Sequence, residues 1–235
     1  LGVALLLAVL ANLFWVRGEE TGARWRLRLA RLRLTRPLLA TTAGLLVLVL
    51  ATGGFIFYNT NVLNDFEDSE EGGAIQARYE KDYKRYEWVP QPRISAVRLR
   101  VDIFPRRRDL RMRGTYRLAN RTGETIDSLH VDVLNSLKIR ELRVDRPAER
   151  VVSDSAAGYY VFRLARPLAP GDSAVLSFDL EHDSRGFQNQ PQYQPVVGNG
   201  TFFNSDWLPS IGYNASGELM DEGAHEKHGL GLRPR

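Results

Sequence analysis

The stretch RISAVRLRVDIF, residues 93–104, alternates apolar and charged side chains with a period of two. Four apolar positions lie on one side of this alternation and three charged positions on the other: Val97, Leu99, Val101 and Ile103 against Arg98, Arg100 and Asp102. Successive side chains of a β-strand point to opposite faces of a sheet, so the pattern is typical of a strand with one buried face. It therefore predicts a β-strand.

Five further stretches downstream have the same strand character. They are Leu110 to Asn120, Ile126 to Leu134, Leu137 to Asp145, Tyr159 to Leu164 and Ser173 to Asp183. Turn-forming residues such as Gly123 and the pair Pro170-Gly171 separate them, and no helical pattern intervenes. Residues 93–183 are therefore expected to form a mainly β domain, an antiparallel β-sandwich or saddle. Residues 184–235 are interpreted as a loop-rich segment leading into a missing C-terminal part.

Upstream of the first strand, residues 59–92 change from an acidic stretch to a helical one. The run from Asp65 to Gly73 is rich in acidic residues and has no apolar periodicity, which predicts a short solvated stalk. The run from Ala74 to Trp88 predicts a short helix, because apolar residues recur in it at helical spacing: Ile75, Tyr79, Tyr83 and Tyr86. This stripe is interpreted as a docking face for the following domain. A ligand-binding platform is the alternative.

The 21 residues from Leu38 to Tyr58 contain neither a charge nor a proline. A helix of that length spans about 30 Å, the thickness of the hydrocarbon core of a bilayer. A second uncharged segment runs from Leu1 to Val16, which fits a helix that has lost its first turn. Residues 1–58 are therefore predicted to be a membrane part with two transmembrane α-helices, at about 1–16 and 38–58.

The interhelical loop, residues 17–37, holds seven arginines against Glu19 and Glu20. A short basic loop stays cytoplasmic, so residues 59–235 are expected on the extracytoplasmic side of the inner (plasma) membrane, in a multi-pass protein. Arginines interleaved with Trp25 and leucines favour an interfacial linker that contacts lipid; a nucleic-acid arm and a solvated loop are the alternatives. Residues 1–58 have a formal net charge of +5 and residues 59–235 have one of −1, so the excess of basic residues belongs to the membrane part. The lipid bilayer is the expected partner, and nucleic acid is not.

The sequence offers few candidates for catalysis or metal binding. There is no cysteine, which excludes disulfides and thiolate metal sites. The stretch His225-Glu226-Lys227-His228 spaces its histidines at i, i+3, and flanking glycines favour a solvated loop over a zinc-binding helix. His130 and His182 are interpreted as structural. No catalytic, cofactor-binding or metal-binding residue is therefore predicted within the 235 residues.

Two other groups of polar residues are weighed as sites. The carboxylates of Asp102, Asp132 and Asp179 alternate with apolar neighbours, so a solvated strand face is expected in preference to a general acid/base pair. A glutamine-dense loop could line a peptide cleft or be an ordinary loop: Gln188, Gln190, Gln192 and Gln194.

The chain from Arg93 to Asp183 resembles the N-terminal β-domain of zinc aminopeptidases of the aminopeptidase N (gluzincin) type. The resemblance rests on RLRVDIFP, on RMRGTYRLANRTGETIDSLHVDV and on ARPLAPGDSAVLSFDLEHD. With the upstream spans, YEKDYKRYEWVPQPRISAV and GNGTFFNSDWLPSIGY, the order of the pieces resembles bacterial proteins in which an ABC transporter permease precedes such a peptidase. The family's HExxH and GxMEN motifs do not occur in the sequence, so the resemblance implies zinc only in a missing catalytic domain.

The first hypothesis is therefore a fragment of a membrane-anchored, aminopeptidase-like protein linked to a permease. Its β-domain would be the scaffold and one wall of the peptide cleft for a zinc peptidase domain beyond residue 235. The fragment is expected to be inactive alone, and the resemblance implies an ABC ATPase subunit, other permease helices and a peptide substrate as partners. The alternatives are a non-catalytic permease component with an extracytoplasmic ligand- or partner-binding β-sandwich, and an adhesion or carbohydrate-binding sandwich on a membrane stalk.

Overall fold

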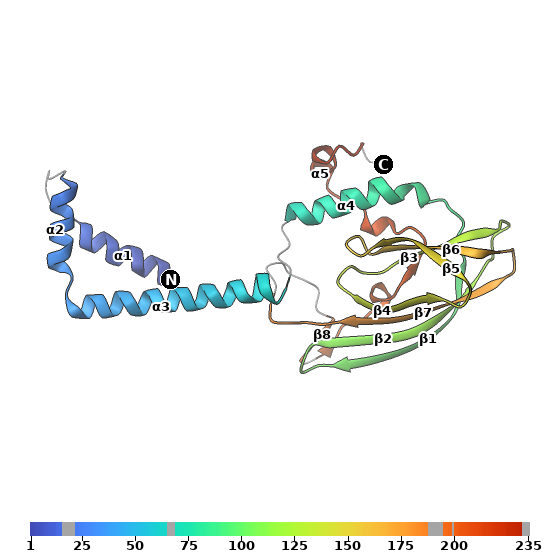
Figure 1. Ribbon diagram of the computed structural model, residues 1–235, viewed down its shortest axis with the longest axis horizontal. Helices are drawn as coiled ribbons and strands as arrows, with labels where there is room; N and C mark the ends of the chain where they lie inside the picture. Colours follow the sequence, from blue (N-terminus) through green and yellow to red (C-terminus); the bar gives the residue numbers. More distant parts are fainter. Residues whose placement is uncertain (16–21, 65–68, 188–194, 199, 232–235) are drawn as a thin grey trace. The chain divides into compact units, whose positions relative to one another are not determined.

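The computed structural model (Figure 1) describes residues 1–15, 22–64, 69–187, 195–198 and 200–231. The chain divides into two compact units. One comprises Leu1–Phe66 with Gly186–Gln188, and the other comprises Glu67–Arg185 with Asn189–Arg235.

The first unit is helical. It contains α1 (Gly2–Phe14), α2 (Ala23–Arg33), α3 (Arg36–Phe57) and a π-helical turn, η1 (Tyr58–Val62). Together α3 and η1 form one helix of 27 residues that is long and apolar enough to cross a membrane, by length and composition. At 13 residues α1 is shorter than the roughly 20 residues that a span requires. The structure thus supports one candidate span where the sequence predicted two.

The basic interhelical segment differs from the predicted linker because part of it is helical. Arginine, leucine and alanine, which make up most of α2, are all good helix formers. Arg33, the last residue of α2, donates hydrogen bonds to backbone carbonyls at the C-terminal end of α1, those of Asn12 at 3.0 Å and Trp15 at 2.7 Å.

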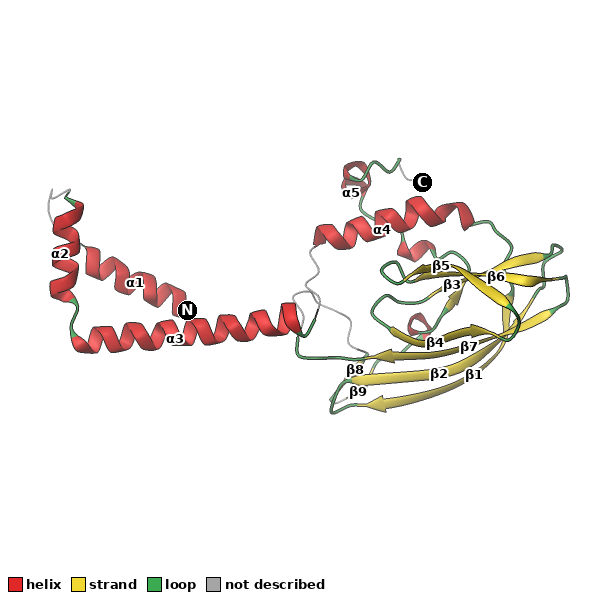
Figure 2. Ribbon diagram, in the orientation of Figure 1, coloured by secondary structure: helices red, strands yellow, loops and turns green. Residues whose placement is uncertain are grey.

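The second unit is mainly β, with antiparallel pairing throughout its described sheets (Figure 2). One four-stranded sheet has the order β1-β2-β7-β4 and the other the order β10-β3-β6-β5. The strands of the first sheet are β1 (Arg93–Phe104), β2 (Asp109–Ala119), β7 (Ser173–His182) and β4 (Lys138–Val144). Those of the second are β10 (Ser210–Ile211), β3 (Ile126–Asp132), β6 (Tyr159–Leu168) and β5 (Ala148–Asp154). A separate short pair joins β8 (Val196–Val197) and β9 (Gly200–Thr201).

The core lies between the two four-stranded sheets. Strand β7 shows the reason most clearly, because every second side chain along it is buried. Leu176 and Leu180 on β7 and Leu129 and Val131 on β3 are among the buried residues of this core. The period-two pattern seen in the sequence therefore produces the sandwich, and the predicted mainly β, antiparallel fold is confirmed.

The sequence prediction missed β5 and the short strands β8, β9 and β10. Strand β5 has the sequence AERVVSD and directly follows Pro147. Its only consecutive apolar residues are Val151 and Val152, which lie among polar and charged residues. It is an edge strand, and backbone pairing with β6 fixes it. An edge strand that buries little has little sequence pattern to reveal it.

Candidate functional site

Helix α4 (Ser69–Tyr83) lies over part of the second sheet (Figure 1). Its tyrosines belong to a buried cluster with Tyr159 and Val161 of β6. Tyr79 and Tyr83 are buried and meet the ring of Tyr159 on β6, with centroids 5.7 and 4.4 Å away. Tyr79 also stacks on Tyr213 at 5.2 Å. The aromatic stripe is therefore the docking face that the sequence predicted. The helix starts five residues before the predicted Ala74, so part of the predicted acidic stalk is helical.

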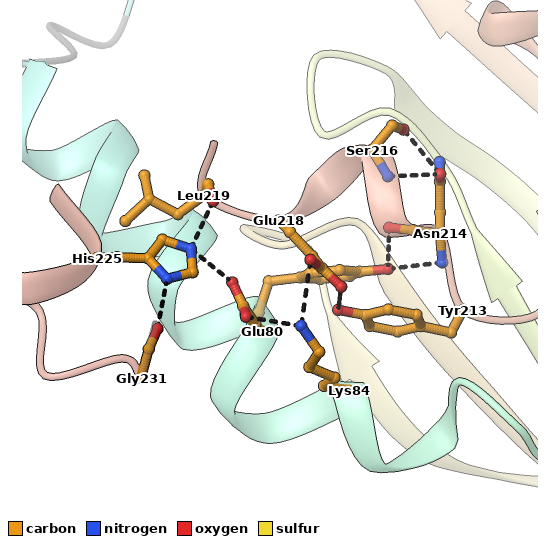
Figure 3. Close-up of polar contacts among 10 residues, drawn as sticks. Glu80, Lys84, Tyr213, Asn214, Ser216, Glu218, Leu219, His225 and Gly231 are labelled. Carbon is orange, nitrogen blue, oxygen red and sulfur yellow. Dashed lines mark hydrogen bonds and ion pairs between the residues drawn. The ribbon is translucent and has the colours of Figure 1, made fainter. Parts of the chain in front are cut away.

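A charged cluster lies beside these rings, where α4 and the 3₁₀ turn η2 (Lys84–Tyr86) meet the C-terminal segment (Figure 3). The Lys84 ammonium contacts the carboxylates of Glu80 at 2.9 Å and Glu218 at 3.3 Å. Glu218 also accepts a hydrogen bond of 2.9 Å from the Tyr213 hydroxyl. Both carboxylates are almost fully buried. Buried carboxylates need such partners, because an unpaired buried charge is strongly unfavourable.

His225 completes the cluster. Its Nε2 lies 2.6 Å from the Leu219 carbonyl and 3.3 Å from Glu80 Oε2, and its Nδ1 lies 3.1 Å from the Gly231 carbonyl (Figure 3). Each ring nitrogen of His225 therefore faces a backbone carbonyl oxygen, which can only accept a hydrogen bond. Lys84 thus lies between the carboxylates of Glu80 and Glu218, and His225 closes the cluster on the side of Glu80.

The arrangement around His225 does not fit zinc. A metal-binding imidazole must offer a lone pair, and here both ring nitrogens point at carbonyl oxygens. Within the described residues, no group of three or more His, Asp or Glu side chains is placed to hold a metal ion. The loop predicted for this stretch is wrong, because Glu222–Lys227 forms the short helix α5. Asp221 caps it by accepting from the Ala224 backbone N–H at 2.7 Å.

Two titratable residues of β3 face α4. His130 is fully buried; its ring nitrogens meet the Tyr159 hydroxyl at 2.8 Å and the Ser128 hydroxyl at 3.2 Å. Burial lowers the pKa of His130 to about 4, although nearby Asp127 acts in the opposite direction. Burial likewise raises the pKa of Asp132 to about 6, and the polar side chains of Asn214 and Tyr79 reduce this shift. Asp132 was predicted to lie on a solvated face. That face of β3 is partly covered by α4 and the C-terminal segment, and Asp132 is half-buried there.

Next to Asp132 the sandwich has an open side, with a cavity of about 900 Å³. The cavity lies where the edge strand of one sheet, β1, faces the edge strand of the other, β10. Its lining includes the apolar side chains of Ile94, Val97 and Leu134 and the polar side chains of Asp132 and Asp206. It combines a hydrophobic wall with a few polar groups, as ligand and interface pockets do.

The remaining residues weighed from the sequence fall into three groups. Asp102 and Asp179 lie on the outer face of the first sheet and pair with arginines, as the solvated-face interpretation predicted. His182 is buried edge-on against Trp207, with centroids 5.1 Å apart. The glutamine-dense loop, with Gln188, Gln190, Gln192 and Gln194, lies outside the described residues.

Sequence reasoning missed the charged cluster because its members are far apart in the chain. Lys84 and Glu218 are separated by 134 positions. One local signal was present, namely the i, i+4 pair Glu80 and Lys84 on the predicted helix. Because Glu80 directly follows Tyr79 in the apolar stripe, that pair borders the docking face.

Replacing Lys84 with methionine is expected to lower the free energy of unfolding by ~2 kcal/mol, since two buried carboxylates lose a shared cation. The Lys84 side chain is itself 37% exposed, which limits the loss. Chemical denaturation measures the effect, and limited proteolysis shows whether α5 is released first. Arg85→Met, at the exposed neighbouring position, is the control. Equal stability of the two variants would contradict a stabilising role for the cluster.

Solved structures with some similarity to this chain are M1 zinc metallopeptidases. The M1 zinc metallopeptidase from Deinococcus radiodurans is 16% identical, with a TM-score of 0.33 over 45% of this chain and 23% of its own. A mutant of that metallopeptidase is 18% identical, with a TM-score of 0.34 over 45% of this chain and 24% of its own. A two-domain M1 zinc metallopeptidase mutant bound to L-tryptophan gives 18% identity, a TM-score of 0.32 and coverage of 39% and 20%.

The chain thus spans less than a quarter of the length of these three proteins. No family model matches the sequence, and no curated protein matches it either.

Proposed function

We propose that this chain supplies the extracytoplasmic β-domain of a membrane-anchored, aminopeptidase-like protein linked to a transporter permease. In this proposal the β-domain is a scaffold and one wall of the peptide cleft for a zinc peptidase domain outside the 235 residues. The helix Arg36–Val62 would anchor it, with the basic segment before the helix on the cytoplasmic side. Other permease helices and an ABC ATPase subunit would be partners of the membrane part.

The observation that carries the proposal is an uncovered apolar face on β1. Val97 and Ile103 pair across the strands with Tyr116 and Leu110, both buried in the core, so they lie on the same inner face. Yet Val97 remains 54% exposed and Ile103 40% exposed. The second sheet therefore leaves Val97 and Ile103 uncovered, although Leu99 and Val101 between them pack against the core, and the open side with its 900 Å³ cavity reaches Val97. Such a face is typical of contact with a further domain.

The same geometry supports a scaffold in preference to a self-contained enzyme. The buried acidic and basic groups of the charged cluster are engaged with one another, and His225 does not fit zinc. These contacts support a structural role for the described residues, and the resemblance of residues 93–183 to aminopeptidase N-type β-domains supports the proposed role as a wall of the cleft.

The test uses the protein encoded by the complete gene. We expect that gene to encode an HExxH motif and a downstream glutamate ligand, and its product to release aminoacyl groups in a zinc-dependent reaction. Val97→Asp should place a charge in the domain contact and lower the free energy of unfolding of the complete protein by about 3 kcal/mol, with loss of activity. In the 235-residue chain the same substitution should change stability little.

The matched control is Val151→Asp, because Val151 is also exposed, at 37%, but lies on β5. It should leave both proteins stable. A complete gene without the zinc motif would overturn the proposal and favour a non-catalytic permease component. Equal effects of the two substitutions would show that β1 is not the contact face.

A further inference from the structure

The β1–β2 hairpin, residues 93–119, differs in charge from the rest of its unit. It contains nine arginines, no lysine and two aspartates, a net charge of +7. Residues 59–235 have a formal net charge of −1, so the residues of this region outside the hairpin have a net charge of −8. The hairpin thus carries a net positive charge, whereas the rest of this region carries a net negative charge.

The strand register places most of this charge on one face. Arg98, Arg100, Asp102 and Phe104 alternate with the inner-face residues of β1, so they lie on the outer face of the first sheet. On β2 they pair with Thr115, Arg113, Arg111 and Asp109 in that order. This outer face is the opposite side of β1 from the apolar face assigned above to a further domain.

The acidic residues of the sheet neutralise only part of this face. Asp102 accepts from Arg100 at 3.2 Å and from Arg113 at 2.8 Å, so one carboxylate serves two guanidinium groups. Arg111 pairs with Asp179 at 2.7 Å. Three more arginines of the hairpin form no ion pair within the described part of the chain: Arg98, Arg106 and Arg117. The face therefore retains a surplus of exposed guanidinium groups.

The hairpin tip adds an aromatic ring to these charges. Phe104 is 40% exposed, and the guanidinium carbon of Arg107 lies 4.7 Å from its ring centroid. The turn that follows Phe104 reads Pro105-Arg106-Arg107-Arg108. An exposed ring beside three arginines has the composition of segments that lie in the headgroup region of a membrane.

We propose that the outer face and tip of this hairpin dock on a phospholipid surface that carries negatively charged headgroups. Guanidinium groups bind phosphate oxygens in a bidentate way, which suits a hairpin with arginine and no lysine. Docking rests on the membrane anchoring proposed above: the helix Arg36–Val62 precedes the hairpin in the same chain, so insertion of that helix makes docking an intramolecular step.

The full chain contains no native cysteine, so a single introduced cysteine can carry a fluorophore. Pro105→Cys labels the hairpin tip, and Ala156→Cys labels the exposed turn between β5 and β6 as a matched control. The labelled chain is reconstituted into phosphatidylcholine vesicles with and without phosphatidylglycerol. The tip label should become shielded from an aqueous quencher only with phosphatidylglycerol, and less so as salt rises from about 0.1 to 1 M. The Ala156 label should stay accessible throughout.

A triple variant, Arg98→Gln, Arg106→Gln and Arg117→Gln, removes arginines that have no ion pair to lose. It should lower the ratio of docked to undocked chain about a hundredfold, at about fivefold per arginine. The control removes three exposed arginines outside the hairpin, with Arg121→Gln, Arg163→Gln and Arg166→Gln. Arg163 loses only an exposed contact of 3.9 Å to Glu149, so the control should leave docking unchanged.

Equal shielding of the tip in vesicles with and without phosphatidylglycerol would overturn the proposal, and so would an unchanged triple variant. Shielding of the tip by an oligonucleotide but not by lipid would also overturn it, and would make the hairpin a nucleic-acid surface. Flotation of the chain with the vesicles tests the membrane anchor separately. If the chain floats with the vesicles but the hairpin label is not shielded, the docking proposal is refuted and the membrane-anchor proposal is not.

Discussion

Replacing Gly158 with alanine is expected to lower the free energy of unfolding by about 3 kcal/mol. Gly158 lies in the turn between β5 and β6 with φ of +72°, a conformation that costs other residues about 1–2 kcal/mol. An added Cβ would also lie 2.0 Å from the backbone oxygen of Val133. That oxygen cannot rotate away as a side chain would, and overpacking of this kind costs about 1–3 kcal/mol.

Two control substitutions separate the two causes. Gly171 also has a positive φ, of +90°, but a Cβ there would meet nothing within 4 Å, so Gly171→Ala should show the conformational cost alone. Gly123 has open space and no positive φ, so Gly123→Ala should change stability by less than about 0.5 kcal/mol. Urea denaturation followed by the fluorescence of buried Trp207 measures all three variants. If Gly158→Ala is no worse than Gly171→Ala, the close approach to Val133 is not a constraint.

Whether the sequence predicted a given strand or helix depended on how much apolar surface that element buries. Strands β1 and β7 could be predicted because one face of each is apolar along its length. Strand β5 could not, because it is an edge strand defined by backbone pairing to β6. Helix α5 escaped prediction for a similar reason: six residues carry too little pattern, and its stability comes from the Asp221 cap and from buried His225.

The candidate site was less predictable because it depends on long-range contacts. The tyrosine stripe of α4 predicted a docking face, but the sequence did not indicate which surface would cover β3. Alternation along β3 predicted a solvated face for Asp132, whereas burial raises the pKa of its carboxyl group. The solvent exposure of that face depends on α4 and on Asn214, whose side chain contacts Asp132. Asn214 lies 82 positions beyond Asp132 in the chain, so the local sequence does not reveal this contact.

His130 and Asp132 are expected to make the stability of the β-domain respond to pH in opposite directions. His130 has its pKa lowered to about 4 in the folded state, against about 6.5 when unfolded. As pH falls through 6.5, the unfolded chain binds a proton that the folded chain does not, and stability is lost down to pH 4. A difference of this size corresponds to ~3 kcal/mol.

Asp132 behaves in the reverse sense, because its pKa is raised to about 6 in the folded state from about 3.8. Its stabilising contribution is complete below pH 3.8 and is lost as pH rises through 6, by a similar ~3 kcal/mol. Between about pH 4 and 6 the two contributions oppose each other. The unmodified chain should therefore show only a weak pH dependence from this pair.

Single substitutions should separate the two opposing pH dependences of the free energy of unfolding. Asp132→Asn leaves His130 alone, so its gain in stability over the unmodified chain should be largest at pH 7, near 3 kcal/mol, and should vanish by about pH 4. His130→Asn leaves Asp132 alone, so its stability relative to the unmodified chain should improve as pH falls from 6.5 to 4. Urea denaturation at pH 7, 5.5 and 4.5 measures both differences, and other titrating groups cancel because all chains share them. Parallel pH profiles for the two variants would show that the face of β3 beneath α4 is hydrated, and that Asp132 and His130 titrate there as they do in water.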